Sequence, residues 1–510
     1  MIIEDQSQII AFLSDTDSHG GVGPVEVIQT HISAVFLVGR TAYKLKKAVH
    51  LPYVDFSTAG IRLAGCEKEV ALNRATTPEL YHGVRRITRE PRGLAFDGAG
   101  ALVDAVVEME RFPQDGLFDE LALRGELTRP LLVELVGAIV SAHAGARVIR
   151  GERGSENVAA VLDINRAGFG ESKVFDAAEV ARIDDAFREG LKRHAPLLDA
   201  RGEAGAIRLC HGDLHLRNVC LFRGRPTLFD CIDFNDRIAT VDILYDLSYL
   251  AMDLWHRELQ SDANFVINRY LDMAGQEDGV PLLPYFTALR AAVRAHVTAT
   301  QAAAMTGERG ETARVAARAY YDRALDILTP RPARLVAIGG LSGSGKSTIA
   351  EALAPWLGAP PGARLLESDH LRKAMFRTRP EERLPEQAYA SGVSDTVYAD
   401  LAERTRRLLE AGCTVVTDAV YDRPERRAEL EKAAEAAGVP FVGIWLEADP
   451  ALLRQRVSMP RDGVSDATVE VLEAQLARDT GPIRWARVPT TCPLSEALSA
   501  INVLLSGGRV

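Results

Sequence analysis

The sequence has few cysteines, and none of them form a CxxC pair. Its six cysteines, at positions 66, 210, 220, 231, 413 and 492, are spread over 510 residues. Disulfide frameworks and zinc sites need cysteines at close, paired spacings. The distribution therefore excludes both and predicts buried thiols in a reducing cytoplasm.

Long hydrophobic runs are also missing. The most apolar windows, such as residues 131–140, are interrupted by Glu134 and fall short of the roughly 20 residues that a bilayer span needs. No basic start followed by an apolar run stands at the N-terminus, so secretion is not indicated. We therefore expect a cytoplasmic protein that does not interact with membranes.

Positive charge is not in excess. The 70 acidic side chains outnumber the 60 lysines and arginines, which gives a net charge of −10. This balance argues against a nucleic-acid-binding surface as the main feature of the molecule. The oligomeric state is left open by the sequence.

The length of 510 residues is too great for one hydrophobic core, so two or three domains are expected. Thr329-Pro330-Arg331-Pro332 follows a long Ala/Arg-rich helical stretch and precedes an apolar strand. Two prolines in four residues end a helix and stiffen a connector. We therefore predict one domain over 1–330 and a second over 331–510.

Within 1–330, the segment His211-Gly-Asp-Leu-His-Leu-Arg-Asn218 carries the strongest chemical signal. Phosphoryl transfer from ATP needs a carboxylate that orients the attacking hydroxyl and oxygen ligands for magnesium. Asp213 suits the first role and Asn218 the second. An apolar strand over 227–229 then ends in acids, where a second metal ligand is expected. Asp230 is slightly favoured there, and Asp233 is the alternative.

The same reaction needs a lysine on the α/β phosphates and an acid that anchors it. Strand side chains alternate, so Ala42, Lys44 and Lys46 share one face of the strand over 42–47. The small Ala42 leaves room for an adenine, which favours Lys44 as the phosphate lysine. Its expected partner is Glu69 on the following helix, with Glu67 close behind.

At these residues the chain resembles the aminoglycoside phosphotransferase family of kinase-like enzymes, which includes choline and other small-molecule kinases. The resemblance covers roughly residues 30–250 and is most specific at 211–218. It implies a bilobal protein-kinase-like fold, with a small β-rich lobe and a large helical lobe, and a small hydroxylated acceptor. The sequence departs from the kinase pattern in having no GxGxxG loop before Lys44, where only Gly39 marks a hairpin.

The second half contains a P-loop motif over 340–347, Gly-Leu-Ser-Gly-Ser-Gly-Lys-Ser. An apolar strand over 335–338 precedes it and a helical segment follows, which is the context in which this motif binds a nucleoside triphosphate. Lys346 is expected to reach the β/γ phosphates and Ser347 to ligate magnesium. The remaining predicted nucleotide-binding residues of the motif are Gly340, Gly343, Ser344, Gly345 and Thr348.

Three later segments of this half add charged candidates. Leu365 to Arg372 reads as a second strand that ends in an acid, with an arginine three residues later at the start of a helix. Asp369 and Arg372 are therefore expected beside the γ-phosphate to orient an acceptor. Asp418 ends the apolar strand over 414–417 and is a second candidate magnesium ligand. Arg454 and Arg461 belong to a basic segment that is interpreted as a lid over the phosphates.

This half looks like the small P-loop kinases, which include gluconokinase-type enzymes, chloramphenicol phosphotransferase, zeta-toxin-like kinases and the kinase half of polynucleotide kinase. The resemblance runs over nearly all of 333–510. It implies an α/β fold with a parallel sheet flanked by helices. The whole arrangement resembles bacterial proteins described as fused aminoglycoside phosphotransferase and AAA-type ATP-binding proteins.

The leading hypothesis is an ATP- and Mg²⁺-dependent phosphotransferase with two catalytic domains, acting on hydroxyl groups of a sugar, an amino sugar or a similar metabolite. One alternative makes one domain a regulatory nucleotide-binding module that controls a single kinase activity. Another is a polynucleotide-kinase-like enzyme for nucleic-acid ends, against which the acidic balance counts.

Overall fold

The computed structural model describes residues 4–30, 32–51, 54–303, 305–379, 382–459 and 467–507. Internal contacts divide the chain into two units, which we name the N-terminal unit (Met1–Asp253 with Leu289–Ala324) and the C-terminal unit (Leu254–Ala288 with Leu325–Val510). No helix in the described ranges is long and apolar enough to cross a membrane.

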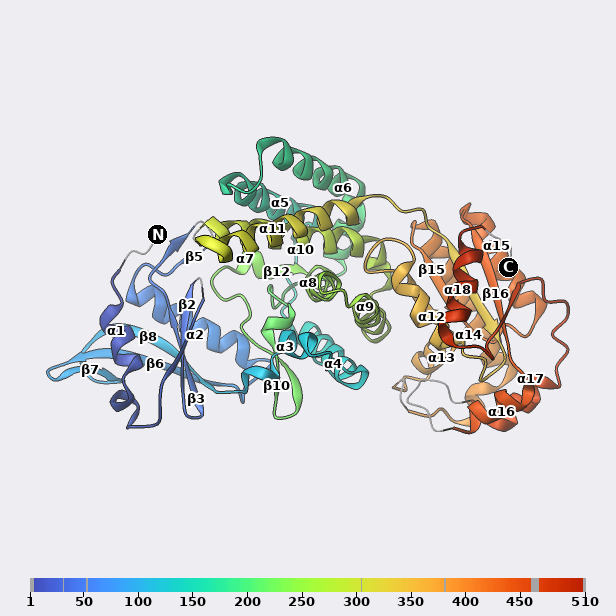
Figure 1. The fold of residues 1–510 in the computed structure, drawn as a ribbon, viewed down its shortest axis with the longest axis horizontal. Helices are drawn as coiled ribbons and strands as arrows, with labels where there is room; N and C mark the ends of the chain where they lie inside the picture. The colour runs from blue at the N-terminus through green and yellow to red at the C-terminus, as the bar shows by residue number, and fades with distance from the viewer. Residues whose placement is uncertain are drawn as a thin grey trace. The chain divides into compact units, whose positions relative to one another are not determined.

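The N-terminal unit contains a six-stranded antiparallel sheet in the order β1-β2-β3-β8-β6-β7 (Figure 1). Its strands are β1 (Glu26–Gln29), β2 (Ser33–Val38), β3 (Thr41–Lys46), β6 (Tyr81–Glu90), β7 (Gly93–Phe96) and β8 (Ala101–Glu110). Helix α1 (Ser7–Ser14) packs on one face through Ile9 and Leu13, against a cluster that includes Tyr43 and Leu45. Helix α2 (Ala59–Arg74) covers the other face, where Ala42 lies. Because strand side chains alternate, Lys44 and Lys46 lie on the α2 face.

The rest of this unit is mainly helical and carries three short strand pairs. The helices are α3 (Phe118–Leu123), α4 (Arg129–Gly145), α5 (Gly154–Glu171), α6 (Ala177–Glu203), α7 (Asp236–Ala239) and the larger parts of α8 (Ile243–His256), α10 (Leu283–Ala303) and α11 (Gly307–Leu328). The strand pairs are β4 (His50–Leu51) with β5 (Val54–Asp55), β9 (Ile207–Leu209) with β12 (Thr240–Asp242), and β10 (Val219–Phe222) with β11 (Arg225–Leu228). A β-rich part followed by a helical part confirms the predicted kinase-like fold.

The C-terminal unit is built on a five-stranded parallel sheet in the order β14-β15-β13-β16-β17. The strands are β13 (Leu335–Gly340), β14 (Arg364–Glu367), β15 (Val415–Asp418), β16 (Phe441–Glu447) and β17 (Ala486–Pro489). All the strands run the same way, so their carboxyl ends meet at one edge of the sheet. There Glu367 and Ile338 both lie in register with Asp418.

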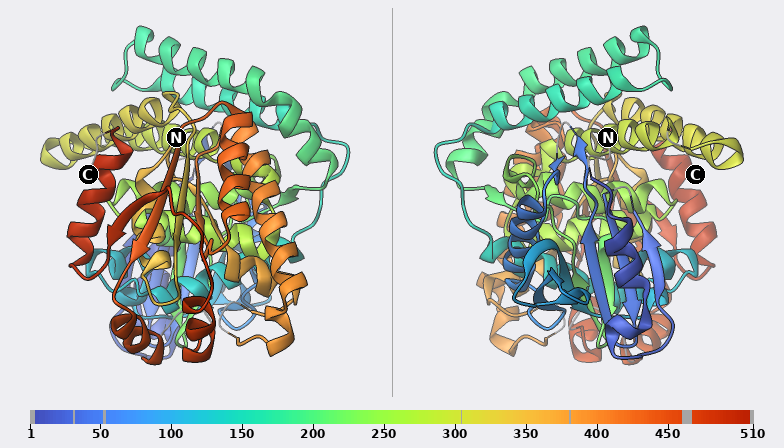
Figure 2. Two further views of the ribbon diagram at one scale, coloured as in Figure 1. Left: turned by 90° about the vertical axis from the view of Figure 1, so that its right-hand side faces the viewer. Right: turned by 90° about the vertical axis from the view of Figure 1, so that its left-hand side faces the viewer.

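Helices cover both faces of this sheet (Figure 2, left). One face packs on α12 (Lys346–Leu353) and α18 (Leu494–Leu505), which contribute Ile349, Leu353 and Ile501 to a core with Val336 and Ile444. The other helices are α13 (Ser368–Met375), α14 (Ser391–Glu410), α15 (Pro424–Ala437), α16 (Pro450–Ser458) and α17 (Val469–Leu476). This architecture confirms the predicted P-loop α/β fold.

The C-terminal unit also includes helix α9 (Gln260–Ala274), which precedes the proline-rich connector in sequence. The contact-based division therefore differs from the sequence-based boundary at 330. The physical reason is that α9 packs on α12 and on the short helical turn Ala354–Trp356 after it, and hydrogen-bonds to the backbone of Ala363 and Leu365 along β14, the edge strand of the sheet. An edge strand whose free amide and carbonyl groups are covered in this way is protected from pairing with other chains.

Candidate active sites

Lysines and carboxylates form an ion-pair network on the α2 face of the N-terminal sheet. Lys44 Nζ lies 2.8 Å from Glu69 Oε1 and also pairs with Asp230. Lys46 Nζ lies 2.6 Å from Glu69 Oε2 and 2.5 Å from Asp233 Oδ2. Glu69 is fully buried; burial opposes its charge, but the two lysines outweigh that effect and lower its pKa to about 2. Both lysines therefore share the predicted anchor, whereas the alternative anchor, Glu67, is exposed.

The two candidate metal-binding aspartates have different environments. The Asp233 side chain is buried against Lys46, and its burial raises its pKa. The Asp230 side chain is 43% exposed, and its backbone adopts a φ of 60°, in the left-handed region that non-glycine residues rarely occupy. The Asp230 amide donates to the Tyr81 hydroxyl at 3.0 Å, which helps to hold this conformation. Of the two carboxylates, that of Asp230 is the more accessible to a ligand.

Asp213 and Asn218 lie together in the loop after β9. Asn218 Nδ2 donates to both the backbone oxygen and Oδ2 of Asp213, each at 2.9 Å. His215 Nε2 lies 3.3 Å from the same Oδ2. Burial works against the charge of Asp213, but His215 and Arg294 outweigh it and hold the pKa of this carboxyl below its usual value. Asp213 is therefore a carboxylate over the physiological pH range.

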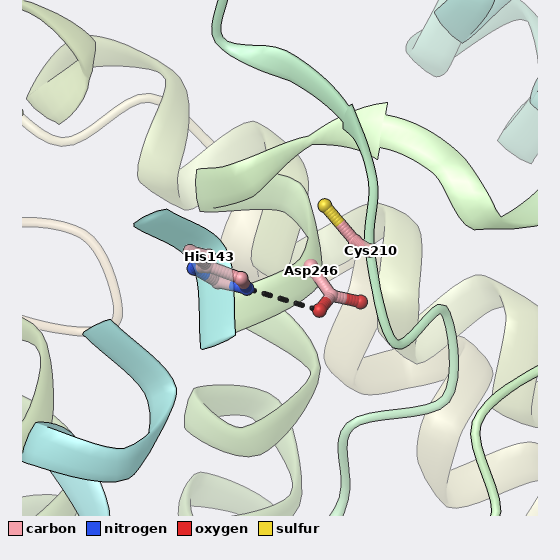
Figure 3. Close-up of side chains that lie close together, drawn as sticks. All are labelled: His143, Cys210 and Asp246. Atoms are coloured by element: carbon pink, nitrogen blue, oxygen red, sulfur yellow. Dashed lines mark hydrogen bonds and ion pairs between the residues drawn. The ribbon is translucent and has the colours of Figure 1, made fainter. Parts of the chain in front are cut away.

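A second layer of charged residues holds this loop in place. Asp246 accepts a hydrogen bond from the Gly212 amide at 2.8 Å and lies 3.1 Å from His143 Nε2 (Figure 3). Arg290 donates to the Gly212 carbonyl at 3.0 Å and approaches Asp246 at 3.5 Å. Similarly, Asp242 pairs with buried Arg201 through both carboxylate oxygens, at 2.8 and 2.9 Å.

Cys210 lies beside His143 and Asp246, so the three residue types match a metal site (Figure 3). The chemistry of the surroundings does not. Both oxygens of Asp246 already accept hydrogen bonds from protein donors. The positively charged guanidinium of Arg290 lies close to Asp246 and would repel a metal cation there. Burial raises the pKa of the Cys210 thiol well above its usual value, which disfavours the thiolate that binds metals. These three residues support the loop.

A cleft of about 390 Å³ lies where β8 ends. The turn between β2 and β3 forms one wall, through Gly39 and Arg40, and the β10–β11 turn forms another. Phe112 and Phe222 add apolar surface. Concave, partly apolar surfaces of this size hold small ligands.

The P-loop of the C-terminal unit has the backbone that phosphate binding needs. Gly343 and Gly345 have φ values of 84° and 91°, in the region open to glycine. A Cβ atom on Gly340 would lie 2.7 Å from the Leu446 carbonyl, so only glycine fits there. Lys346 Nζ donates to the Leu341 carbonyl at 3.3 Å, and the Ser344 hydroxyl is buried. Thr348, in the first turn of α12, is exposed.

Ser347 and Asp418 meet at the carboxyl end of the sheet. The Ser347 hydroxyl donates to Asp418 Oδ2 at 2.5 Å. Burial raises the pKa of Asp418, and the nearby Lys346 works in the opposite direction. Oxygen atoms from a hydroxyl and a carboxylate are suitable ligands for Mg²⁺. The two predicted magnesium ligands are therefore brought together.

Asp369 and Arg372 both lie on α13, but their side chains have different environments. Asp369 is half-buried in the first turn of this helix. Arg372 is buried, donates to the Ala388 carbonyl at 2.7 Å and stacks on the Tyr389 ring at 4.9 Å. These contacts join α13 to the segment before α14.

The basic segment over α16 contacts the P-loop through one of its arginines. Arg454 pairs with Glu473 on the surface at 2.6 Å, and Arg461 lies outside the described residues. Arg456 instead donates to the carbonyl of the P-loop residue Gly343 at 3.4 Å. Gln475, on α17, accepts a hydrogen bond from the Ser342 amide at 2.8 Å. Arg456 belongs to the predicted basic segment, whereas no motif signals Gln475, because it acts on the loop from a separate helix.

Comparison with known proteins assigns a family to each half. Residues 96–279 match the phosphotransferase enzyme family, and residues 335–482 match the AAA domain family. An uncharacterized protein of Mycobacterium tuberculosis is 26% identical over 483 residues, covering 93% of this chain and 94% of the relative.

Two further proteins each match a part of the chain. An adenylyl-sulfate kinase of Myxococcus xanthus is 31% identical over 149 residues, covering 28% of this chain and 69% of the relative. A solved structure of a choline/ethanolamine kinase family protein from Mesorhizobium loti is 13% identical, covers 64% of this chain and 95% of that one, and has a TM-score of 0.41. The chain belongs to the kinases in which a phosphotransferase-family domain is joined to a P-loop kinase domain.

Proposed function

We propose that the chain is an ATP- and Mg²⁺-dependent phosphotransferase with two catalytic sites, each of which phosphorylates a hydroxyl group of a small molecule. The observation that carries the proposal is that each unit brings together its own lysine, carboxylates and neutral oxygen donors, the groups that phosphate, Mg²⁺ and an acceptor hydroxyl need. Lys44, Asp213 and Asp230 belong to the first set. Lys346 and Asp418 belong to the second.

In the N-terminal site, Lys44 would bind the α/β phosphates, and Glu69 would hold its ammonium in place from the buried side. Asn218 uses its amide nitrogen to hold Asp213, which leaves its carbonyl oxygen free to serve as a metal ligand, and the accessible Asp230 carboxylate would be the second ligand. These are the hard oxygen donors that Mg²⁺ prefers, so the residues fit the ion. Bound Mg²⁺ would supply positive charge to the phosphate oxygens. The base of the nucleotide would occupy the cleft at the end of β8.

Asp213 would orient the acceptor hydroxyl and take its proton. The acceptor oxygen forms a bond to the γ-phosphorus, the bond from that phosphorus to the β,γ-bridging oxygen breaks, and ADP leaves with the electron pair. The lowered pKa of Asp213 keeps the carboxylate charged for this role.

In the C-terminal site, the amides of the P-loop and the start of α12 would bind the phosphates, and Lys346 would reach the β/γ oxygens. Ser347 and Asp418 would hold Mg²⁺. Asp369 would orient the acceptor hydroxyl at the start of α13, and Arg372 would fix that helix through Ala388. The transfer step breaks and forms the same bonds as in the first site.

The test is ATP-dependent phosphate transfer over a panel of sugars, amino sugars, aminoglycosides, nucleosides and adenylyl sulfate. Adenylyl sulfate is included because one relative is named as its kinase. Wild type, Asp213→Asn and Lys346→Ala are compared in parallel. We expect each variant to lose transfer to a different acceptor, or to stall a different step of one sequence.

If Lys346→Ala loses all transfer and Asp213→Asn keeps the transfer of wild type, the N-terminal unit would instead be a regulatory module. Transfer only to nucleic-acid ends, with binding that weakens steeply in salt, would support an end kinase.

A further inference from the structure

Helix α9 carries a polar stripe that covers the edge of the C-terminal sheet. Asn264, Asn268 and Asp272 are four residues apart, so they lie on one face of the helix. Asn268 accepts a hydrogen bond from the Leu365 amide at 2.8 Å and donates to the Ala363 carbonyl at 3.2 Å. Asn264 donates to the same carbonyl at 3.0 Å. The stripe thus takes the place of a neighbouring strand along β14.

Asp272, the last member of the stripe, binds two cationic side chains. One of its oxygens pairs with the guanidinium of Arg364, which is buried at the start of β14. The other lies 3.0 Å from Nδ1 of His370, in the first turn of α13. Glu277, which follows α9, lies 3.1 Å from the same guanidinium, and no contact between Glu277 and His370 is present among the described residues.

His370 connects Asp272 to the carboxyl end of the sheet. Its Nδ1 also lies 3.2 Å from Glu367 Oε2, at the end of β14. Glu367 is in register with Asp418, whose carboxylate accepts the hydrogen bond from Ser347. His370 directly follows Asp369, the proposed acceptor-orienting residue. A continuous series of contacts and register neighbours therefore leads from α9 to the P-loop.

The charges along this series favour a firm attachment. Burial opposes the charge of His370, but Glu367 and Asp272 outweigh it and raise the pKa of the imidazole to about 9. Burial also works against Asp272, but Arg364 and His370 lower the pKa of this carboxyl to about 2. Asp272 and His370 are thus oppositely charged at neutral pH, and charge-assisted hydrogen bonds are the stronger kind.

We infer that Asp272 is a positioning residue of the P-loop kinase site: by holding His370, it sets the orientation of the first turn of α13, where Asp369 would meet the acceptor. The inference rests on the proposed function of this site and adds to it a residue from outside the P-loop family match. Asp272 lies within the segment 96–279 that matches the phosphotransferase family. The P-loop kinase site would therefore be positioned by a residue from the segment that matches the phosphotransferase family.

The experiment measures ATP hydrolysis, with water as the acceptor, by full-length protein carrying Asp213→Asn, so that turnover reports the P-loop site. Into this background Asp272→Asn, His370→Gln, Glu277→Gln and Lys346→Ala are introduced separately, and Asp272→Asn and His370→Gln are also combined in a double variant. Glu277→Gln is the matched control, because it removes a charge from Arg364 and leaves His370 in place. Thermal unfolding of each variant checks that the unit remains folded.

We expect Asp272→Asn to lower kcat about 10- to 100-fold, which is the range found when a residue that orients a metal ligand is removed. The KM for ATP should change less than about twofold. His370→Gln should give a similar loss, and the double variant should lose little more than either single one, because both changes act through one contact. Glu277→Gln should keep the kcat of the background.

Equal kcat values for Asp272→Asn and Glu277→Gln would overturn the positioning role, because the effect would then come from Arg364 or from stability alone. Additive losses in the double variant would also overturn it. Unchanged hydrolysis in Lys346→Ala would remove the proposed function of the P-loop site, and the positioning role would fall with it.

Discussion

The two candidate sites hold charge in different ways. In the N-terminal unit, side chains from distant segments carry the site: Lys44 meets an aspartate 186 residues away, and Lys46 meets one 187 residues away. In the C-terminal unit, one short loop presents backbone groups, and its glycines provide the conformation. A site built from paired charges should fail when one charge is removed, whereas a site built from backbone should fail when a methyl group is added.

The largest effect should come from Lys46→Met. This substitution leaves the buried Asp233 carboxylate without its partner, and breaking a buried pair costs about 3–5 kcal/mol of unfolding free energy. Lys44→Met should cost less than half as much, because Asp230 is partly exposed and Glu69 keeps Lys46. Chemical denaturation that follows the N-terminal unit measures both. Equal losses would show that the two lysines are equivalent, and Lys47→Met, which is outside the network, serves as the control.

The next effect distinguishes the two metal candidates. Asp230→Asn should raise the Mg²⁺ concentration needed for half-maximal transfer by about 10- to 100-fold, since an accessible ligand is lost. Asp233→Asn should change this concentration less, because its carboxylate is already bound to Lys46. Magnesium titrations of the turnover that Asp213→Asn abolishes provide the measurement. The reverse order would assign the metal to Asp233.

The phosphate site of the C-terminal unit relies on backbone groups, but Asp272 at the edge of its sheet carries a buried charge. The pH dependence of stability tests the role of that charge. The pKa of Asp272 is lowered to about 2 from 3.8, so its charge stabilises the folded state above pH 4 and this stability is lost as the pH falls towards 2. At pH 7 the unfolding free energy of wild type should exceed that of Asp272→Asn by about 2 kcal/mol, because each unit of pKa shift corresponds to about 1.4 kcal/mol. Unfolding curves between pH 7 and 2 should show this difference shrinking. A difference that is independent of pH would mean that the carboxylate charge has no role.

The smallest effect should come from adding one methyl group to the P-loop. Gly343 has a φ of 84°, and a Cβ atom there would lie 2.9 Å from the Leu453 carbonyl. The strain of about 1–2 kcal/mol should weaken nucleotide binding by roughly tenfold in Gly343→Ala. Gly412 has a similar φ of 78° with open space around it. Gly412→Ala is therefore the control, because it introduces similar backbone strain outside the P-loop. If both variants bind nucleotide as wild type does, the loop backbone is not what holds the phosphates.

The same difference explains what could be predicted from sequence. The P-loop is contiguous, and the strand and helix around it were predicted correctly because hydrophobic pattern and glycine positions are local signals. Alternation along β3 predicted correctly that Lys44 and Lys46 share a face. Which aspartate each lysine meets depends on the turn after β11, where Asp230 adopts an unusual backbone conformation that composition does not reveal.

The role of α9 could not be predicted for a similar reason. Asn264, Asn268 and Asp272 have the spacing and polarity of an ordinary solvated helix face. Their partners, Leu365, Arg364 and His370, lie more than ninety positions later, beyond the connector that marked the expected boundary. Only the three-dimensional structure shows that this face covers a strand edge.

The measurement that tests the central claim most directly is the stoichiometry of nucleotide binding by isothermal titration calorimetry, with ADP and Mg²⁺. Two separate sites predict two nucleotides per wild-type chain, one in Lys44→Met, one in Lys346→Ala and none in the double variant. One nucleotide per wild-type chain, lost in one single variant and unaffected by the other, would contradict the claim that both units bind ATP.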